Sequence, residues 1–559
     1  MISPSGSATS PSRNFWTAAG IVLALTIVRL VGLRFSTVDL FFDESQYWSW
    51  SQELALGYFS KPPLLAWLIG AAEHLCGQSE ACIRAPAPLV SLVISLLTYA
   101  IGRTLYDLRT GFWAAMLAAF ATGSVFAARI VSTDLPLVLF WALALLAYVR
   151  LLKKADWRWA VVLGLAIGAG LLAKYAMLYF LPGLVLAAAF EKRARALLAS
   201  AELRLALMSA VIVATPNILW NVDNGFVAFR YAGGNVVGEP IELSVMRPLE
   251  FLAAQFAVFG PAVFGVAIAL LGRGAVAYGR ALLSPTPFAG QLNGMSAMIF
   301  RERKLATQSL WRDPLARNSE LARQAGRGED RGKCDRYRLL PADRIMLAFA
   351  LPPLAVVVVT ASLVHVYANW AAAAFVPLAV LAAATLTRRN LSLLLWGSLA
   401  LGIAAQIALI GADAFATRIR VPFLAKSNPY YRTLGWNAYG RTVGQLARKL
   451  KISVIASDTR AEVASLLYYW RNQAEQILAW PTIQDLPAFD LTRALTAAAP
   501  QPVLFVSQCQ DADRLKQFYA KVTPLGIFVP DDPVPRGFAA FTLEEARGPI
   551  GPLAPCRTG

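Results

Sequence analysis

The sequence predicts a mainly α-helical, polytopic membrane protein that ends in a smaller α/β domain outside the membrane. Hydrophobic residues make up 57% of its 559 residues, only 15% are charged and the mean hydropathy is +0.51, unlike a typical soluble domain. Apolar runs long enough to cross a bilayer recur from Phe15 to Asp413. From residue 414 onward, short apolar strands alternate with helices, which is typical of an α/β domain.

The apolar runs predict about eleven transmembrane helices of the kind that a bilayer requires. The run at 62–76 is too short to span easily and predicts a re-entrant or interfacial helix. Residues 1–14 are rich in Ser and Pro and are expected to be disordered. The predicted spans are residues 15–33, 83–102, 111–128, 134–152, 159–173, 175–190, 205–222, 248–271, 345–363, 370–386 and 392–412.

Basic residues orient these spans. With the amino terminus inside, the loops on the inner side are rich in Lys and Arg, which follows the positive-inside rule and accounts for the net charge of +18. The Arg-rich segment 272–344 is then a cytoplasmic loop or insertion, to which we assign no catalytic role. A nucleic-acid partner is not expected, because no aromatic residues interleave with the basic ones.

Residues 15–413 would therefore form the membrane domain and residues 414–559 the outer α/β domain. In the latter, 452–457, 502–507 and 526–529 read as strands, and 460–470 and 511–520 as helices. Two cysteine pairs fall outside the membrane, where disulfides can form, although spacing alone leaves both pairings open. These pairs are Cys76 with Cys82 and Cys509 with Cys556.

The adjacent carboxylates Asp43 and Glu44 follow the first predicted span. Two acidic residues among aromatic ones beside a membrane helix are costly, which favours a functional site. A carboxylate in a partly dehydrated setting can take a proton from a hydroxyl group. In isolation, however, either residue could simply cap the next helix.

Three cations are expected at the same outer face, namely Lys61, Lys174 and Arg247. Each alone could be an interfacial anchor. Together with the carboxylates, they form a more specific pattern, in which groups that hold an anion lie beside a base. The remaining candidates are a third acidic residue, Asp134, which could also cap its helix, and possible substrate contacts at Tyr58, His365, Asn369 and Trp370.

Several short motifs resemble those of the GT-C glycosyltransferases, in the group of protein O-mannosyltransferases and the lipid A aminoarabinose transferase. The resemblance covers residues 15–480 except the insertion. It rests on Asp43-Glu44, Tyr58-Phe-Ser-Lys61-Pro-Pro, Thr133-Asp-Leu-Pro136, Leu172-Ala-Lys-Tyr175, Pro216-Asn-Ile-Leu-Trp-Asn221 and Ala368-Asn-Trp370.

This resemblance implies a multi-pass enzyme of the bacterial inner membrane with a periplasmic active site. It would act as a monomer and move a sugar, with inversion, from a polyprenyl-phosphate donor to a lipid or protein acceptor. Asp43 would be the base, Asp134 a second site carboxylate, and Lys61, Lys174 and Arg247 would bind the donor phosphate. The residue before the lysine is a metal-binding glutamate in the aminoarabinose transferase but Ser60 here, so support for a divalent metal is weak.

A transporter or flippase of lipid-linked sugars is the alternative interpretation, because it would share the many spans and the interfacial cations. It would place charged residues at mid-membrane depth and would show repeated, broken helices. Here the ionisable residues gather at the outer edge, and an outer domain follows the last span. The sequence therefore favours the transferase.

Overall fold

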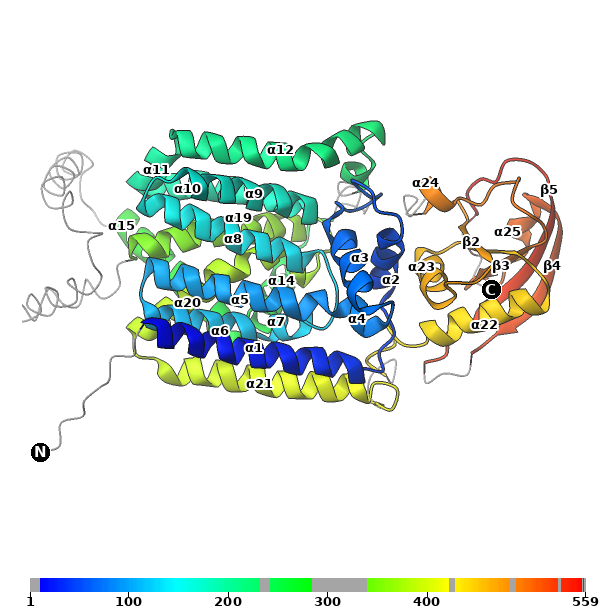
Figure 1. Ribbon diagram of the computed structural model, residues 1–559, viewed down its shortest axis with the longest axis horizontal. Helices are drawn as coiled ribbons and strands as arrows, with labels where there is room; N and C mark the ends of the chain where they lie inside the picture. The colour runs from blue at the N-terminus through cyan, green and yellow to red at the C-terminus, as the bar shows by residue number, and fades with distance from the viewer. Residues whose placement is uncertain are drawn as a thin grey trace, which may run out of the picture.

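The protein consists of a bundle of long helices and a sheet domain at one end of it, separated by a layer of short helices (Figure 1). The structure is a computed structural model that describes residues 11–231, 242–283, 339–421, 428–481, 489–530, 534–554 and 556. The expected cytoplasmic insertion therefore lies largely outside the described residues. Helix α1 begins at Pro11 and so includes the end of the segment that was expected to be disordered.

In the described part of the chain, seven helices are long and apolar enough to cross a membrane, and each matches a predicted span. The other four predicted spans form shorter helices, so the count of eleven is not confirmed. The bundle consists of α1 (Pro11–Phe35), α5 (Pro86–Leu105), α6 (Leu108–Phe120), α7 (Thr122–Ala127), α8 (Asp134–Lys153), α9 (Trp157–Ala173), η1 (Tyr175–Tyr179), α10 (Phe180–Phe190), α11 (Lys192–Leu198), α12 (Ala201–Asp223), α14 (Met246–Val258), α15 (Pro261–Leu283), α19 (Pro341–Ala361), η2 (Ala368–Ala374), α20 (Phe375–Arg388) and α21 (Ser392–Ala414).

The prediction of one span at 248–271 is wrong, because two helices, α14 and α15, meet there. Gly260 between them has a φ of +88°, a conformation that glycine adopts without steric cost. Pro261 then begins α15, at the helix position where its missing N–H is harmless. The predicted span 111–128 also consists of two helices, because α6 ends at Phe120 and the short α7 begins at Thr122.

Small residues let neighbouring helices approach closely. A Cβ atom on Gly164 of α9 would lie 2.3 Å from the carbonyl oxygen of Ala206 in α12, and one on Gly168 would lie 2.6 Å from Val213. Helices in a membrane gain stability from such close packing because hydrophobic burial does not favour their association there. These two glycines, four residues apart, therefore fix α9 against α12.

The layer of short helices covers the end of the bundle that faces the sheet domain (Figure 1). It consists of α2 (Phe42–Ser51), α3 (Leu64–Cys76) and α4 (Glu80–Arg84). Helix α3 occupies the run that was predicted to be a short re-entrant or interfacial helix. Cys76 and Cys82, whose pairing the sequence left open, form a disulfide that joins α3 to α4, with Cα atoms 5.8 Å apart.

The outer domain is a five-stranded mixed sheet with the strand order β2-β1-β3-β5-β4. Strand β1 pairs in parallel with β2 and β3, whereas β5 runs antiparallel to β3 and β4. Helix α23 contacts α2 of the membrane part. The elements are α22 (Trp436–Lys449), β1 (Val454–Ser457), α23 (Arg460–Tyr469), β2 (Gln476–Ala479), α24 (Asp490–Arg493), β3 (Val503–Ser507), α25 (Asp513–Lys516), β4 (Tyr519–Phe528) and β5 (Phe538–Ala546).

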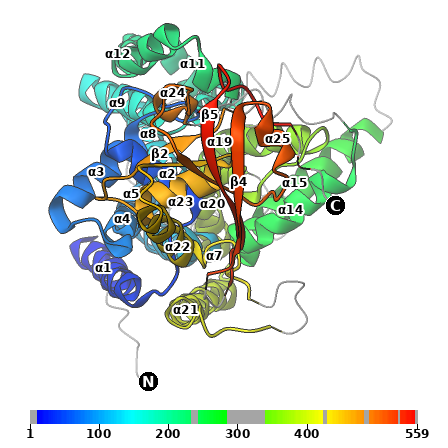
Figure 2. The same cartoon turned by 90° about the vertical axis from the view of Figure 1, so that its right-hand side faces the viewer.

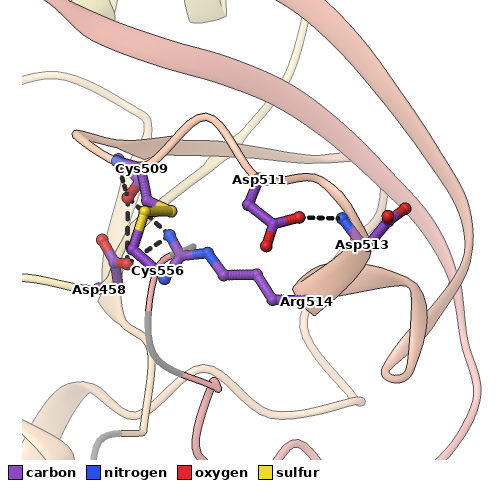
Figure 3. Close-up of a disulfide and its surroundings, with 7 residues drawn as sticks. Asp458, Cys509, Asp511, Asp513, Arg514 and Cys556 are labelled. Atoms are coloured by element: carbon purple, nitrogen blue, oxygen red, sulfur yellow. Dashed lines mark hydrogen bonds and ion pairs between the residues drawn. A yellow bond between two sulfur atoms is a disulfide. The ribbon is translucent and has the colours of Figure 1, made fainter. Parts of the chain in front are cut away.

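Most of the predicted elements of this domain are confirmed, but the helix predicted at 511–520 ends at Lys516. Tyr519 already begins β4, where its side chain is buried and its backbone pairs with Ala546 of β5. Tertiary pairing overrides local preference at this point. Cys509 and Cys556, the second pair that the sequence left open, also form a disulfide, and Figure 3 shows it beside the ion pair of Asp458 and Arg514.

Candidate functional site

The candidate site lies where the bundle meets α2 and the outer domain. The carboxylate Asp43 lies on α2, Asp134 begins α8, and Lys174 directly follows α9. Asn369 lies in η2, which precedes α20. The structure thus brings residues from four distant parts of the sequence to one end of the bundle, as the charge pattern predicted.

Asp43 lies in the first turn of α2 and forms an ion pair with Arg460, the first residue of α23. The guanidinium of Arg460 also lies 5.0 Å from the ring centre of Phe42. About a third of the Asp43 side chain (36%) remains exposed to solvent. The outer domain therefore contributes a cation directly to the predicted base.

Sequence reasoning missed Arg460. One signal could have found it, because Arg460 comes three residues after the predicted strand that became β1. Ligand contacts in α/β domains gather beyond the carboxyl ends of parallel strands. Its partner, however, lies 417 residues earlier in the chain, and no local pattern reports that pairing.

Glu44 has a different environment from its neighbour, because it is buried and fully engaged. Its carboxylate accepts hydrogen bonds from the Arg84 guanidinium at 2.7 Å and from the backbone N–H groups of Phe41 and Val131, each at 3.0 Å. Arg84 in turn donates to the carbonyl oxygens of Val38 and Asp39. These contacts favour a structural role for Glu44, in place of the catalytic one that was expected.

Asp134 is held between two donors at the start of α8. Lys174 Nζ lies 2.6 Å from one carboxylate oxygen, and Asn369 Nδ2 lies 2.6 Å from the other. Lys174 extends the end of α9, and Asn369 comes from η2, so this unit joins three parts of the bundle. Two predicted site residues and one predicted substrate contact therefore form a single hydrogen-bonded group.

Lys61 lies in the loop between α2 and α3, and its ammonium group is 5.8 Å from the ring centre of Tyr231. The pKa of Lys61 is lowered to about 8, first because the group loses hydration and then because Lys174 repels a second positive charge. Asp43 and Asp134 oppose this shift by attracting the ammonium group. Lys61 is therefore a cation whose charge is only partly offset by its surroundings.

The electrostatics place the charged groups in one region. The pKa of Lys61 responds to Asp43, Asp134, Lys174 and Arg460 together. The pKa of the buried Tyr47 is raised by loss of hydration and then by Asp43, and Arg460 opposes that shift. Asp43, Asp134 and Lys174 thus act electrostatically on Lys61, and Asp134 and Lys174 are in direct contact at 2.6 Å.

Tyr58 stabilises the loop that carries Lys61. Its ring stacks on Trp50 at 4.8 Å, and its buried hydroxyl donates to the Trp50 carbonyl at 2.8 Å and accepts from Ala55 N–H at 3.1 Å. The backbone N–H of Tyr58 also donates to the carbonyl of Lys61 at 3.0 Å. These contacts assign it to positioning Lys61, although the sequence had suggested a substrate contact.

Three other predicted residues lie in different surroundings. Arg247 donates to the carboxylate of Glu242 at 3.1 Å and to the carbonyl oxygen of Leu363 at 3.4 Å. The rings of His365 and Trp370 pack near Tyr367, at 5.3 and 6.2 Å. A role for Arg247, His365 or Trp370 in substrate binding stays a prediction.

The described part of the chain contains no group of three or more His, Cys, Asp or Glu side chains arranged to hold a metal ion. The side chains gathered at this end of the bundle suit proton transfer and the stabilisation of negative charge. A partly exposed carboxylate can accept a proton, and Lys61 and Lys174 can stabilise a negative charge beside it. This arrangement fits group transfer from an anionic donor.

Comparison with known proteins points to the same chemistry. Residues 60–220 match a family model described as dolichyl-phosphate-mannose-protein mannosyltransferase. The lipid A galacturonosyltransferase RgtD of Rhizobium johnstonii is 28% identical over 468 residues, which cover 82% of this chain and 84% of RgtD. The lipopolysaccharide core galacturonosyltransferase RgtB of the same organism is 29% identical over 212 residues, or 36% of this chain and 42% of RgtB.

The fold has counterparts among solved structures. ArnT from Cupriavidus metallidurans, bound to undecaprenyl phosphate, superposes with a TM-score of 0.59 over 93% of this chain and 97% of its own. The two sequences are only 13% identical, so this likeness concerns the fold. It extends over both the helical bundle and the outer sheet domain.

Proposed function

Starting from the GT-C glycosyltransferase that the family model, the curated relatives and the fold indicate, we propose that this protein transfers a sugar from a polyprenyl-phosphate donor. The acceptor is a glycolipid of the bacterial envelope, and the reaction takes place at the periplasmic face of the inner membrane. The single observation that carries this proposal is that a partly exposed carboxylate, Asp43, and the ion pair of Lys174 with Asp134 lie at the same end of the bundle as Lys61, on whose ammonium group all three act.

Asp43 acts as the general base. Its partly exposed carboxylate accepts the proton of the acceptor hydroxyl, whose oxygen attacks the anomeric carbon. The bond from that carbon to the phosphate oxygen breaks, and the attack from the opposite face inverts the configuration. Glu44, only one residue away, is left out of this role because Arg84 and two backbone N–H groups occupy its carboxylate.

Lys61 and Lys174 stabilise the leaving phosphate. The departing polyprenyl phosphate gains negative charge, and cations fixed nearby lower the energy of the transition state. Asp134 holds Lys174 in place at 2.6 Å and is itself held by Asn369. The prenyl chain lies along apolar helix faces, so that binding far from the reacting atoms positions the phosphate.

The names of the similar proteins indicate which substrates should be tested first. ArnT was solved with undecaprenyl phosphate, and RgtD and RgtB are named for lipid A and lipopolysaccharide core, which supports a polyprenyl-phosphate donor and a glycolipid acceptor. Galacturonic acid is the first sugar to test, since both curated relatives are named for it.

A transfer assay in detergent tests this function. Purified protein is incubated with synthetic polyprenyl-phosphate sugars and lipid A, and the product is detected by mass spectrometry. Asp43→Asn should lower the rate by about 10²–10⁴-fold, the range usual for loss of a general base. Detergent solution has no compartments, so a transporter would give no product.

The matched control is Asp513→Asn, which removes an exposed carboxylate of the outer domain. It should leave the rate unchanged. If Asp43→Asn stays folded and keeps more than about a tenth of the activity, Asp43 is not the base. If the wild-type protein transfers no sugar from any polyprenyl-phosphate donor, the proposed function itself is wrong.

A further inference from the structure

A cleft of about 440 Å³ lies between α2 and the outer domain, with Phe42 of α2 in its wall. Two arginines, Arg432 and Arg536, line it, and its described lining contains no acidic residue. Aromatic and amide side chains form much of the remaining wall, among them Tyr431, Trp436 and Gln508. The proposed function uses none of these residues.

Aromatic rings support both guanidinium groups. The Arg536 guanidinium lies 3.9 Å from the ring centre of Trp436 and donates to the carbonyl oxygens of Leu434 and Tyr431. The Arg432 guanidinium lies 5.3 Å from the ring centre of Phe41, and its side chain is exposed. Planar cations held in this way are suited to phosphate or carboxylate groups, which they bind through paired hydrogen bonds.

The cleft adjoins the base. Phe42, in its wall, directly precedes Asp43, and Ala461, also in its wall, directly follows Arg460. Asp43 and Arg460 are themselves an ion pair. A molecule bound in the cleft therefore lies against the two chain segments that carry this pair.

The cleft also lies beside a lipid-facing surface. Asn428 in its wall donates to the carbonyl of Ala416, just beyond the end of α21, at 2.9 Å. Helix α21 exposes large apolar side chains along its length, including Trp396 and Ile407. In Figure 2, α21 lies on one side of α2, whereas α9 and α12 lie on the other.

We propose that this cleft binds the anionic headgroup of the glycolipid acceptor, with Arg432 and Arg536 as the contacts for its phosphate or carboxylate groups. The acyl chains of the acceptor lie along the apolar face of α21. Donor and acceptor then approach Asp43 from opposite sides, because Lys174 follows α9 on the far side of α2. This inference rests on the proposed function. It adds the place where the acceptor binds and the two arginines that bind it.

Arg432→Gln is the test, because Arg432 is exposed and Arg536 also supports the neighbouring backbone. The Michaelis constant for lipid A with both phosphates should rise about tenfold, as for loss of one charge-assisted hydrogen bond, while that for the donor stays unchanged. Direct binding of the same lipid A to Arg432→Gln in an inactive Asp43→Asn background should weaken by the same factor.

Two further acceptors identify the anionic group. If the contact is to phosphate, the effect of Arg432→Gln disappears with lipid A stripped of its phosphates. If the contact is to carboxylate, the effect persists with a longer, dephosphorylated acceptor that carries acidic core sugars and disappears only when those sugars are reduced to alcohols. Either result supports the cleft.

The control is Arg547→Gln, an exposed arginine of the outer domain that does not line the cleft. It should change neither constant. The cleft proposal is overturned if wild-type enzyme glycosylates lipid A and Arg432→Gln leaves the acceptor constant and affinity unaltered, or affects charged and uncharged acceptors equally. It is also overturned if only protein acceptors are modified. Absence of any transfer by the wild-type enzyme counts against the proposed function.

Discussion

Two groups of charged side chains in the bundle, one in its interior and one at its outer end, differ in their partners. In the interior, Arg29 of α1 donates to Gln406 at 2.8 Å, to Ser91 at 3.0 Å and to the carbonyl of Ala119 at 2.7 Å. All three guanidinium nitrogens are thereby bonded. A buried cation must be satisfied in this way, since an unpaired one would be very costly.

At the outer end, two of the charges, Asp43 and Lys61, keep capacity for a further partner. Asp43 remains about a third exposed, and Lys61 has an aromatic ring as its neighbour and carboxylates only at longer range. The same contrast separates Asp43 from Glu44, although they adjoin in sequence. The number of partners that a charge already has, and not the charge itself, distinguishes a structural group from one that can meet a substrate.

Breaking the pair of Glu44 and Arg84 tests the structural side of this comparison and should have the largest effect. Glu44→Gln leaves a buried arginine without its counter-charge, which should lower the free energy of unfolding by about 3–5 kcal/mol. Thermal unfolding in detergent measures this change. Glu53→Gln, which breaks the exposed pair with Arg493, should cost less than about 1 kcal/mol. A Glu44→Gln protein of normal stability that is inactive would make Glu44 catalytic.

Removing the charge of Lys61 tests the functional side. Lys61→Met should reduce kcat/KM for the donor by about 10–100-fold, as for loss of one charged contact to phosphate, with little change in stability. Steady-state kinetics with the donor varied measure this. A large drop in unfolding temperature with normal kinetics would mean that Lys61 is structural.

The pH dependence of donor use is a second test of whether the charge of Lys61 serves the reaction. The pKa of Lys61 lies at about 8, so the ammonium form predominates below that pH and is lost as the pH rises through it. Wild-type kcat/KM for the donor should therefore fall above about pH 8, because this ratio reports the free enzyme. Lys61→Arg stays charged and should remove that fall. An unchanged alkaline limb in this variant would assign it to another group.

The smallest expected effect concerns the outer domain. Burial, then Asp458, raises the pKa of Glu462 to about 7, so the folded domain favours its neutral form. The stability that the neutral Glu462 side chain contributes to the folded domain is present at low pH and is lost as the pH rises from about 4.5 to 7. Glu462→Gln should flatten this dependence, by about 1–3 kcal/mol between pH 5 and 8. Unfolding curves measure it, with Glu544→Gln on the surface as control. An unchanged pH dependence would contradict the assignment.

Much of the helical architecture could be predicted from the sequence. Long apolar runs must form helices in a bilayer, since every backbone group needs a partner there, and basic loops orient them. Seven predicted spans are confirmed on this basis. The spacing of the cysteines left both pairings open, and the structure contains both disulfides. The division of 248–271 at Gly260 was not predicted, because hydropathy does not detect a break between two apolar helices.

The sequence by itself determined that carboxylates and cations gather at one end of the bundle, because hydropathy and loop charge decide on which side of the membrane each residue lies. Only the tertiary structure decided which of them remain available. Arg84 and Arg460 come from distant segments, and their pairing assigns Glu44 to the framework and brings the outer domain to Asp43. Partners so far apart in the chain are set by packing, which local patterns do not encode.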